Sequence, residues 1–151
     1  MIKYSKYTGN KRDQYMRLFL IGDEDESKVR EYINQGCLFL AEQSNTAVAV
    51  AIVVPTSDGN VGELKNIAVD AKAQGQGIGS KMIAYVFEQA RDRYKTILVG
   101  TGDADVQNIL FYLKNGFRFS GIKKDFFDEY KEQIISNGVV LKDMVLLTKK
   151  V

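Results

Sequence analysis

The residues best suited to chemistry in this chain form a glycine-rich run, Gln74-Gly75-Gln76-Gly77-Ile78-Gly79-Ser80. It lies between a strand-like stretch and a segment of helical periodicity. Three glycines at alternate positions remove side chains where the backbone must approach another group closely. A helix that begins here directs its first N–H groups and the positive end of its dipole at that group. The run therefore predicts a binding site for a phosphate or pyrophosphate.

Two familiar phosphate motifs do not fit this run. A P-loop requires a lysine directly before a serine or threonine, and no lysine precedes Ser80. A dinucleotide-binding fingerprint requires a third glycine where this chain has Ser80, and that fingerprint follows the first strand of a βαβ unit. A glycine turn without a ligand is the alternative interpretation. The strand before the run and the helix after it favour the ligand site.

The composition excludes several kinds of catalysis. The 151 residues contain no histidine, which excludes a histidine base and the Ser-His-Asp arrangement. The single cysteine, Cys37, excludes a disulfide within the chain and a thiolate metal cluster, and it begins an apolar run in which burial is expected. Proton transfer must therefore use Glu, Asp, Lys, Tyr or water. We expect no metal.

Charge and hydropathy narrow the class of protein. A net charge of +2 is too small to predict a nucleic-acid partner. No apolar run has transmembrane length, and the polar N-terminal residues predict no signal peptide, so we expect no membrane partner. The length suits one domain over residues 1–151, and we expect it to be cytoplasmic.

The spacing of apolar residues predicts an alternation of strands and helices. We expect strands over 2–7, 37–42, 47–55, 61–69, 96–100, 117–124 and 139–148, and helices over 11–21, 25–35, 75–93 and 106–115. Short turns join the three strands between residues 37 and 69, which predicts an antiparallel meander. The helical crossover then makes strand 96–100 parallel to strand 61–69. Asp105 is the expected N-cap of the last helix, and Asn137-Gly138 predicts a tight hairpin.

A second motif follows the glycine run and an intervening strand. Gln74, Gly77 and Gly79 resemble the acetyl-CoA pyrophosphate loop of the GNAT N-acetyltransferase superfamily. The segment from Asn108 to Phe117 is similar to a later motif of that family, with Asn108, Tyr112, Lys114 and Gly116-Phe117 at the matching positions. Two motifs in the family's order are more specific than either alone, and the chain is identified as resembling a small bacterial-type, single-domain GNAT member.

The resemblance implies a fold and a co-substrate. The fold is an α/β arrangement with a mixed, mostly antiparallel seven-stranded sheet and helices on both faces, whose fourth and fifth strands are parallel and splay apart. Acetyl-CoA would enter that cleft as co-substrate. Its pantetheine arm would pair with the backbone of Ile67 and Val69, and its pyrophosphate would bind the N–H groups of Gln74, Gly75, Gln76, Gly77, Ile78, Gly79 and Ser80.

The resemblance also implies an activity, the direct transfer of an acetyl group to a primary amine within a ternary complex. Glu63 is the candidate base, and a period of two places it on one strand face with Lys65, Ile67 and Val69. A strand amide near Ile67 or Ala68 would hold the developing oxyanion. Tyr112 would protonate the leaving thiolate.

Each of these roles has a plainer alternative. Glu63 is equally well a surface glutamate at a strand start, and Tyr112 a core tyrosine on an apolar helix. Asn108 would bond the co-substrate or neighbouring backbone. Lys114 would meet the adenosine phosphate or remain a solvated lysine. The chain as a whole is alternatively a non-catalytic acyl-CoA-binding module on the same fold, or a binder of another phosphate ligand.

The motifs leave the acceptor open. The family's acceptor is set by the first two helices and the C-terminal hairpin, here 11–35 and 125–140, and small-molecule amines, amino acids, antibiotics and peptide or protein termini all remain candidates. Phe126, Phe127 and Tyr130 would line an acceptor pocket or form a homodimer contact. The acidic run from Asp23 to Glu26 suits the start of a helix, and the alternative is an acidic lip that attracts a cationic acceptor.

Overall fold

The computed structural model describes residues 1–151. Its internal contacts divide the chain into two compact units, one of residues 1–95 with Val151 and one of residues 96–150. Each unit has its own secondary structure and is described by itself. None of the helices in either unit has the length and hydropathy needed to cross a membrane.

The N-terminal unit is built on four antiparallel strands. They pair in the order β1-β2-β3-β4, with bounds β1 (Ile2–Lys6), β2 (Cys37–Gln43), β3 (Thr46–Pro55) and β4 (Val61–Val69). The predicted meander of three strands is confirmed. Strand β3 is buried over most of its length because it has a neighbour on each edge and helices on both faces, as its continuous apolar sequence indicates.

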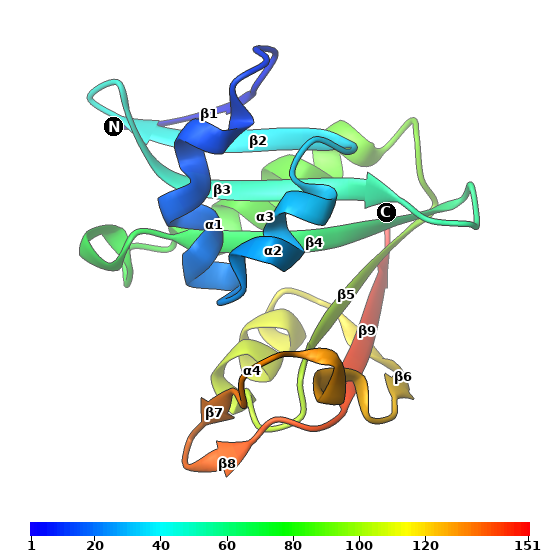
Figure 1. Cartoon of the computed structure of the whole chain (residues 1–151). Helices are drawn as coiled ribbons and strands as arrows, with labels where there is room; N and C mark the ends of the chain where they lie inside the picture. Colours follow the sequence, from blue (N-terminus) through cyan, green and yellow to red (C-terminus); the bar gives the residue numbers. More distant parts are fainter. The chain divides into compact units, whose positions relative to one another are not determined.

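Helices cover both faces of this sheet (Figure 1). A short 3-10 turn, η1 (Arg12–Tyr15), leads into α1 (Met16–Gly22), and α2 (Glu26–Tyr32) follows on the same face. Helix α3 (Ile78–Ala90) lies on the opposite face, after the turn η2 (Ala71–Ala73). The predicted helix over 11–21 is therefore α-helical only from Met16 onward.

The two faces carry different side chains. Beneath α1 and α2 a buried apolar cluster contains Leu38 and Leu40 of β2 and Val50, Ile52 and Val54 of β3, with Ala68 of β4. On the other face the ring of Phe39 packs edge-on against Tyr85 of α3, with 5.8 Å between centroids. The predicted apolar stripe of α3 is buried, as expected for a helix packed on a sheet, at Ile78, Met82, Val86 and Ala90.

Strand β4 contains one more residue than its partner over the same length. Ile52 pairs with Asn66, but the next residue, Val53, pairs with Leu64, so Lys65 has no partner of its own in the ladder. This is a β-bulge, which exchanges the faces of the residues on its two sides relative to a regular strand. The bulge decides where the site residues of β4 point.

The C-terminal unit has a three-stranded antiparallel sheet and one helix. Strand β9 (Met144–Lys150) lies between β5 (Thr96–Gly102) and β6 (Arg118–Lys123), and α4 (Val106–Lys114) connects β5 to β6. The turn η3 (Phe126–Glu129) precedes the hairpin of β7 (Ile135–Ser136) and β8 (Val139–Val140). Asn137 and Gly138 have φ angles of 54° and 76°, which confirms the predicted tight hairpin.

The predicted strand over 139–148 is wrong as one element. It is divided into β8 and β9 by Leu141–Asp143, because the backbone N–H groups of Lys142 and Asp143 donate to the carboxylate of Asp103 instead of to a strand. The amide of Leu141 donates to Ile134, which ends the hairpin there.

Candidate functional site

The glycine run forms a tight left-handed turn at the start of α3. Gly75 and Gly77 have φ angles of 80° and 77°, a conformation that residues with a Cβ rarely adopt. A Cβ atom built on either glycine would meet no other atom within 4 Å. The two glycines are therefore needed for backbone conformation, and the space beside them is free for a ligand.

The N-terminus of α3 is not neutralised by the chain itself. Gly77 occupies the N-cap and offers no side chain, and no acidic residue lies in the first turn. The amide of Lys81 donates to the carbonyl of Gly77 at 3.1 Å, which closes the first turn. The amides of Ile78, Gly79 and Ser80 precede this bond and have no partner within the helix. A helix of this length presents a partial positive charge there, suited to an anion.

An acidic residue that sequence reasoning missed fixes the chain before the turn. The carboxylate of Asp70 accepts hydrogen bonds from the Lys72 amide at 3.1 Å and from Arg17 of α1 at 2.8 Å. The Lys72 amide and the Arg17 guanidinium together hold the pKa of Asp70 below its usual value. The predicted ligand residue Gln74 instead turns its side-chain amide back to the carbonyl of Val69, at 3.0 Å.

Successive backbone N–H groups of β4 point alternately to its two edges. The amide of Asp70, the residue that follows β4, donates to the carbonyl of Val48 in β3 at 2.7 Å. In an antiparallel pair every second residue bonds to the same neighbour, so Ala68 also directs its N–H toward β3, whereas Ile67 and Val69 direct theirs away from it. Of the two amides expected near the reacting carbonyl, that of Ile67 is directed to the edge of β4 opposite β3, and that of Ala68 is directed toward β3.

The bulge also corrects the expected position of Glu63. Glu63 pairs with Val54, which belongs to the cluster beneath α1 and α2, whereas Ile67 pairs with Ala51 on the α3 face. Directly paired residues share a face, so Glu63 lies on the opposite face from Ile67 and Val69. The period of two failed because Lys65 is an extra residue between them. Glu63 is thus placed beside the first two helices.

Glu63 and its neighbours form a polar cluster on that face. The ammonium of Lys65 lies 3.6 Å from a carboxylate oxygen of Glu63 and 5.8 Å from the ring centroid of Tyr32 in α2. The hydroxyl of Tyr32 donates to the carboxylate of Asp23, between α1 and α2, at 3.2 Å. Burial raises the pKa of Asp23, in spite of hydrogen bonds from the Asp25 amide and Tyr32 that lower it.

The predicted acid lies in the C-terminal unit. Tyr112 of α4 is buried, with its ring packed against Phe111 and Phe117 at centroid distances of 5.4 and 5.5 Å. Burial raises the pKa of the Tyr112 hydroxyl strongly, and the negative charge of Asp105 raises it further. Tyr112 is therefore a neutral phenol at ordinary pH. On the same helix, Asn108 and Lys114 are exposed.

Asp105 stands at the N-cap position of α4, but its side chain does not cap the helix. Its carboxylate accepts hydrogen bonds from the hydroxyl of Thr101 at 3.4 Å and the amide of Gly102 at 3.3 Å. The predicted N-cap position of Asp105 is confirmed, but its carboxylate bonds to donors at the end of β5 and not to the first turn of the helix. The charge of Asp105 instead influences Tyr112.

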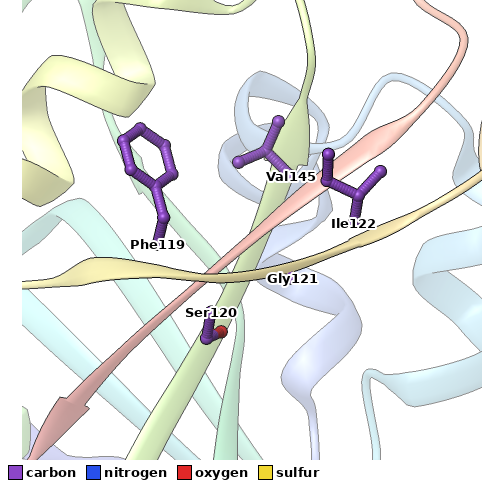
Figure 2. Close-up of a pocket in the computed structure, with 5 residues that line it drawn as sticks. All are labelled: Phe119, Ser120, Gly121, Ile122 and Val145. Carbon is purple, nitrogen blue, oxygen red and sulfur yellow. The ribbon is translucent and has the colours of Figure 1, made fainter.

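One apolar hollow of the C-terminal unit contains none of the predicted site residues. It lies over strand β6 and the neighbouring β9, and Figure 2 shows the residues that line it: Phe119, Ser120, Gly121, Ile122 and Val145. It has no charged group and no side-chain donor or acceptor other than the hydroxyl of Ser120. The hollow is therefore not a candidate for the chemistry described above.

Comparison with known proteins places these features in a family. The model of the acetyltransferase (GNAT) family matches residues 7–117, which include the glycine turn, β4 and α4. The chain belongs to the GNAT acetyltransferase family. Family membership supports acetyl transfer as the general reaction and acetyl-CoA as the co-substrate.

Three similar acetyltransferases cover nearly the whole chain. An uncharacterized N-acetyltransferase, YvbK, of Bacillus subtilis is 33% identical over 89% of this chain and 88% of its own. A GNAT acetyltransferase from Elizabethkingia anophelis with acetyl-CoA bound has a TM-score of 0.92 at 35% identity, covering 99% and 98% of the two chains. A Bacillus subtilis acetyltransferase in complex with CoA has a TM-score of 0.90 at 29% identity, covering 100% and 99%. The predicted GNAT fold class is confirmed.

The raised pKa of Asp23 yields a stability prediction. A carboxyl whose pKa is higher in the folded protein destabilises the fold when it is ionised, fully above the folded pKa and not at all below the unfolded pKa. Asp23→Asn should therefore raise the melting temperature at pH 7 by about 1–3 °C and much less near pH 4. Thermal unfolding across this pH range, with the exposed Asp13→Asn as control, measures it. A melting temperature that falls at pH 7 contradicts the argument.

Proposed function

We propose that this protein transfers the acetyl group of acetyl-CoA to a primary amine by direct attack in a ternary complex. The observation that carries the proposal is the glycine turn at the uncapped N-terminus of α3, with free space beside Gly75 and Gly77. It occurs in a chain similar over its whole length to GNAT proteins with acetyl-CoA or CoA bound.

The turn is the proposed pyrophosphate site. The backbone N–H groups of residues 74–80 would bind the phosphate oxygens, and the α3 dipole would favour their negative charge. The open space beside Gly75 and Gly77 fits this use, because any side chain there would occupy the region next to those amides. The Asp70–Arg17 pair would hold the preceding turn in position.

Strand β4 is the proposed site of the pantetheine arm and the reacting carbonyl. Ile67 and Val69 direct backbone groups away from β3, so they can pair with an extended amide-bearing chain. Acetyl-CoA supplies the acetyl group as a thioester. The Ile67 amide would donate a hydrogen bond to the oxygen of that carbonyl as negative charge develops on it.

Glu63 is the proposed base. An amine attacks only when neutral, so a proton must leave the ammonium form before or during attack. Glu63 lies on the face covered by α1 and α2, with the ammonium of Lys65 3.6 Å from its carboxylate, and this carboxylate would accept the proton. A water molecule would relay the proton where the amine does not reach the carboxylate directly.

Tyr112 is the proposed acid. When the carbon–nitrogen bond forms and the carbon–sulfur bond breaks, the leaving sulfur needs a proton, and a buried neutral phenol still holds one to donate. Asn108 and Lys114, exposed on the same helix, are proposed to contact the co-substrate. A cytoplasmic location, a single domain and a homodimer contact stay predictions.

The glycine turn is tested by a side chain that tolerates its backbone. Asparagine adopts positive φ more readily than most other residues with a Cβ, so Gly77→Asn adds bulk with less strain than another side chain would cause. We expect it to weaken acetyl-CoA binding at least about tenfold, since an occupied phosphate site costs on the order of 1.4 kcal/mol or more. Calorimetric titration measures the dissociation constant, with ATP and NAD as control ligands.

Gly138→Asn is the matched control for this variant. Gly138 has nearly the same φ, 76°, and no atom within 4 Å of a built Cβ, but it lies in the β7–β8 hairpin. Equal binding by Gly77→Asn and the wild type would remove the turn from the site. Binding of ATP or NAD in preference to acetyl-CoA would remove the proposed function.

Tyr112→Phe tests the acid. The ring packing against Phe111 and Phe117 is kept while the donor is lost, so turnover should fall by about 10²-fold with the acetyl-CoA dissociation constant nearly unchanged. Steady-state kinetics with an amine acceptor measure the loss, and Tyr94→Phe serves as control. Unchanged turnover would leave Tyr112 a core residue, and binding without any turnover in the wild type would indicate an acyl-CoA-binding module.

Glu63→Gln tests the base through its pH dependence. Without a carboxylate to accept the proton, activity should depend on amine that is already neutral, so the loss should be about 10–100-fold near pH 6 and smaller near pH 9. The pH profile of kcat/KM measures it, and the exposed Glu88→Gln of α3 is the control. A profile identical to that of the wild type would sink the assignment.

A further inference from the structure

A buried asparagine stands at the bulge of β4, in surroundings that favour apolar side chains. Asn66 is 4% exposed on the face beneath α1 and α2, where its strand neighbours in the core are Ile52 and Ala68. Its carbonyl oxygen is buried and has no hydrogen-bond partner. An unpartnered buried acceptor costs about 1–3 kcal/mol. Packing alone does not account for a polar residue here.

Both N–H bonds of the Asn66 side-chain amide are donated to the helices that cover this face. One donates to the carbonyl of Phe19 in α1 at 2.9 Å, and the other to the hydroxyl of Tyr32 in α2 at 3.0 Å. Gly22 leaves room for this arrangement, since a Cβ at that position would lie 2.2 Å from the Asn66 oxygen. One side chain of β4 thus fixes both helices of this face.

The second bond continues to a carboxylate. The Tyr32 hydroxyl, which accepts from Asn66, donates to one oxygen of Asp23 at 3.2 Å, and the amide of Asp25 donates to the other at 3.2 Å. A carboxylate has about four acceptor positions, so two donors orient Asp23 and leave acceptor capacity for a further donor. The orientation of the Asp23 carboxylate is therefore fixed by a series of hydrogen bonds that begins at Asn66, beside the bulge.

The charges on this face favour a cation. The cluster holds two carboxylates, those of Glu63 and Asp23, and one cation, Lys65, whose charge acts on both. Of the neighbouring acidic residues, Glu26 pairs with Arg30, and Glu24 is exposed. An ammonium group would add a charged donor to a partly buried carboxylate, an interaction stronger than a neutral hydrogen bond. An anionic acceptor would meet repulsion there.

We propose that Asn66 is a positioning residue that, through Tyr32, orients Asp23 to bind an ammonium group of the acceptor, so that the enzyme selects amines with a second positive charge. This inference rests on the proposed acetyl transfer and names its substrate class. Asp23 binds the ammonium that does not react, and Glu63 takes the proton from the amine that does.

Three probes with a four-carbon chain differ in the charge at the far end, and the two equivalent amines of the diamine account for only about a twofold advantage. We would compare 1,4-diaminobutane, n-butylamine and 4-aminobutanoate, whose far ends are positive, neutral and negative. The expected order of kcat/KM is diamine, then monoamine, then amino acid, with about tenfold between steps. The readout is acetylated product formed by the wild-type protein at saturating acetyl-CoA.

Tyr32→Phe removes the hydroxyl that links Asn66 to Asp23 by hydrogen bonds, but it keeps the aromatic ring in the core. It should raise the KM for 1,4-diaminobutane about tenfold and reduce the preference over n-butylamine, with the acetyl-CoA dissociation constant unchanged. Asp23→Asn should act alike, and the pair should be non-additive. Tyr15→Phe, which removes a hydroxyl from a ring packed on the same cluster, is the control. Asn66→Leu is the direct variant, and Tyr32→Phe carries the test where that variant does not fold.

Each outcome decides one point. A diamine preference lost in Tyr32→Phe and kept in Tyr15→Phe supports the inference. Acetylation of n-butylamine or 4-aminobutanoate as efficiently as the diamine, or a KM unchanged in Tyr32→Phe and Asp23→Asn, overturns the inference and leaves acetyl transfer intact. Binding of acetyl-CoA with no product from any amine overturns the proposed function, and the inference with it.

Discussion

The one-residue bulge in β4 is the constraint on which the proposed site depends. A regular strand would place Glu63 on the same face as Ile67 and Val69, where α3 covers the sheet. The extra residue at Lys65 places Glu63 beneath α1 and α2 and leaves Ile67 and Val69 with backbone groups directed away from β3. A single strand can thereby offer backbone amides to one substrate and a carboxylate to another.

The glycine turn offers backbone groups to a ligand, whereas the polar cluster offers side chains. At the turn, side chains are absent, and the helix supplies exposed N–H groups whose arrangement is fixed by backbone conformation at Gly75 and Gly77. On the α1–α2 face, side chains supply the polar groups, and buried Asn66 donates hydrogen bonds to Phe19 and Tyr32 on that face. The first arrangement suits a ligand part common to every acetyl-CoA-dependent reaction. The second can change with the acceptor.

The sequence allowed prediction of the features that depend on neighbouring residues alone. The glycine turn, the buried stripe of α3 and the Asn137-Gly138 hairpin follow from backbone preference and periodicity, and all three are present. The face of Glu63 could not be predicted, since an extra residue in a strand leaves no compositional mark. The hydrogen-bond partners of Asp70, Asp105 and Asp103 likewise depend on which groups the fold brings close to them. Arg17 and Asp70, for example, are 53 residues apart in the sequence.

The ion pair between Arg17 and Asp70 has a consequence for how specificity can evolve. It joins α1, a helix beside the proposed acceptor face, to the turn that leads into the proposed phosphate-binding glycines. Arg17 is 66% exposed, so the link is easily weakened by a neighbouring charge or by salt. A change in α1 that removes Arg17 or adds a charge beside it would therefore act on the proposed co-substrate turn as well. Under the proposed function, the two substrates would not be recognised by fully independent parts of the protein.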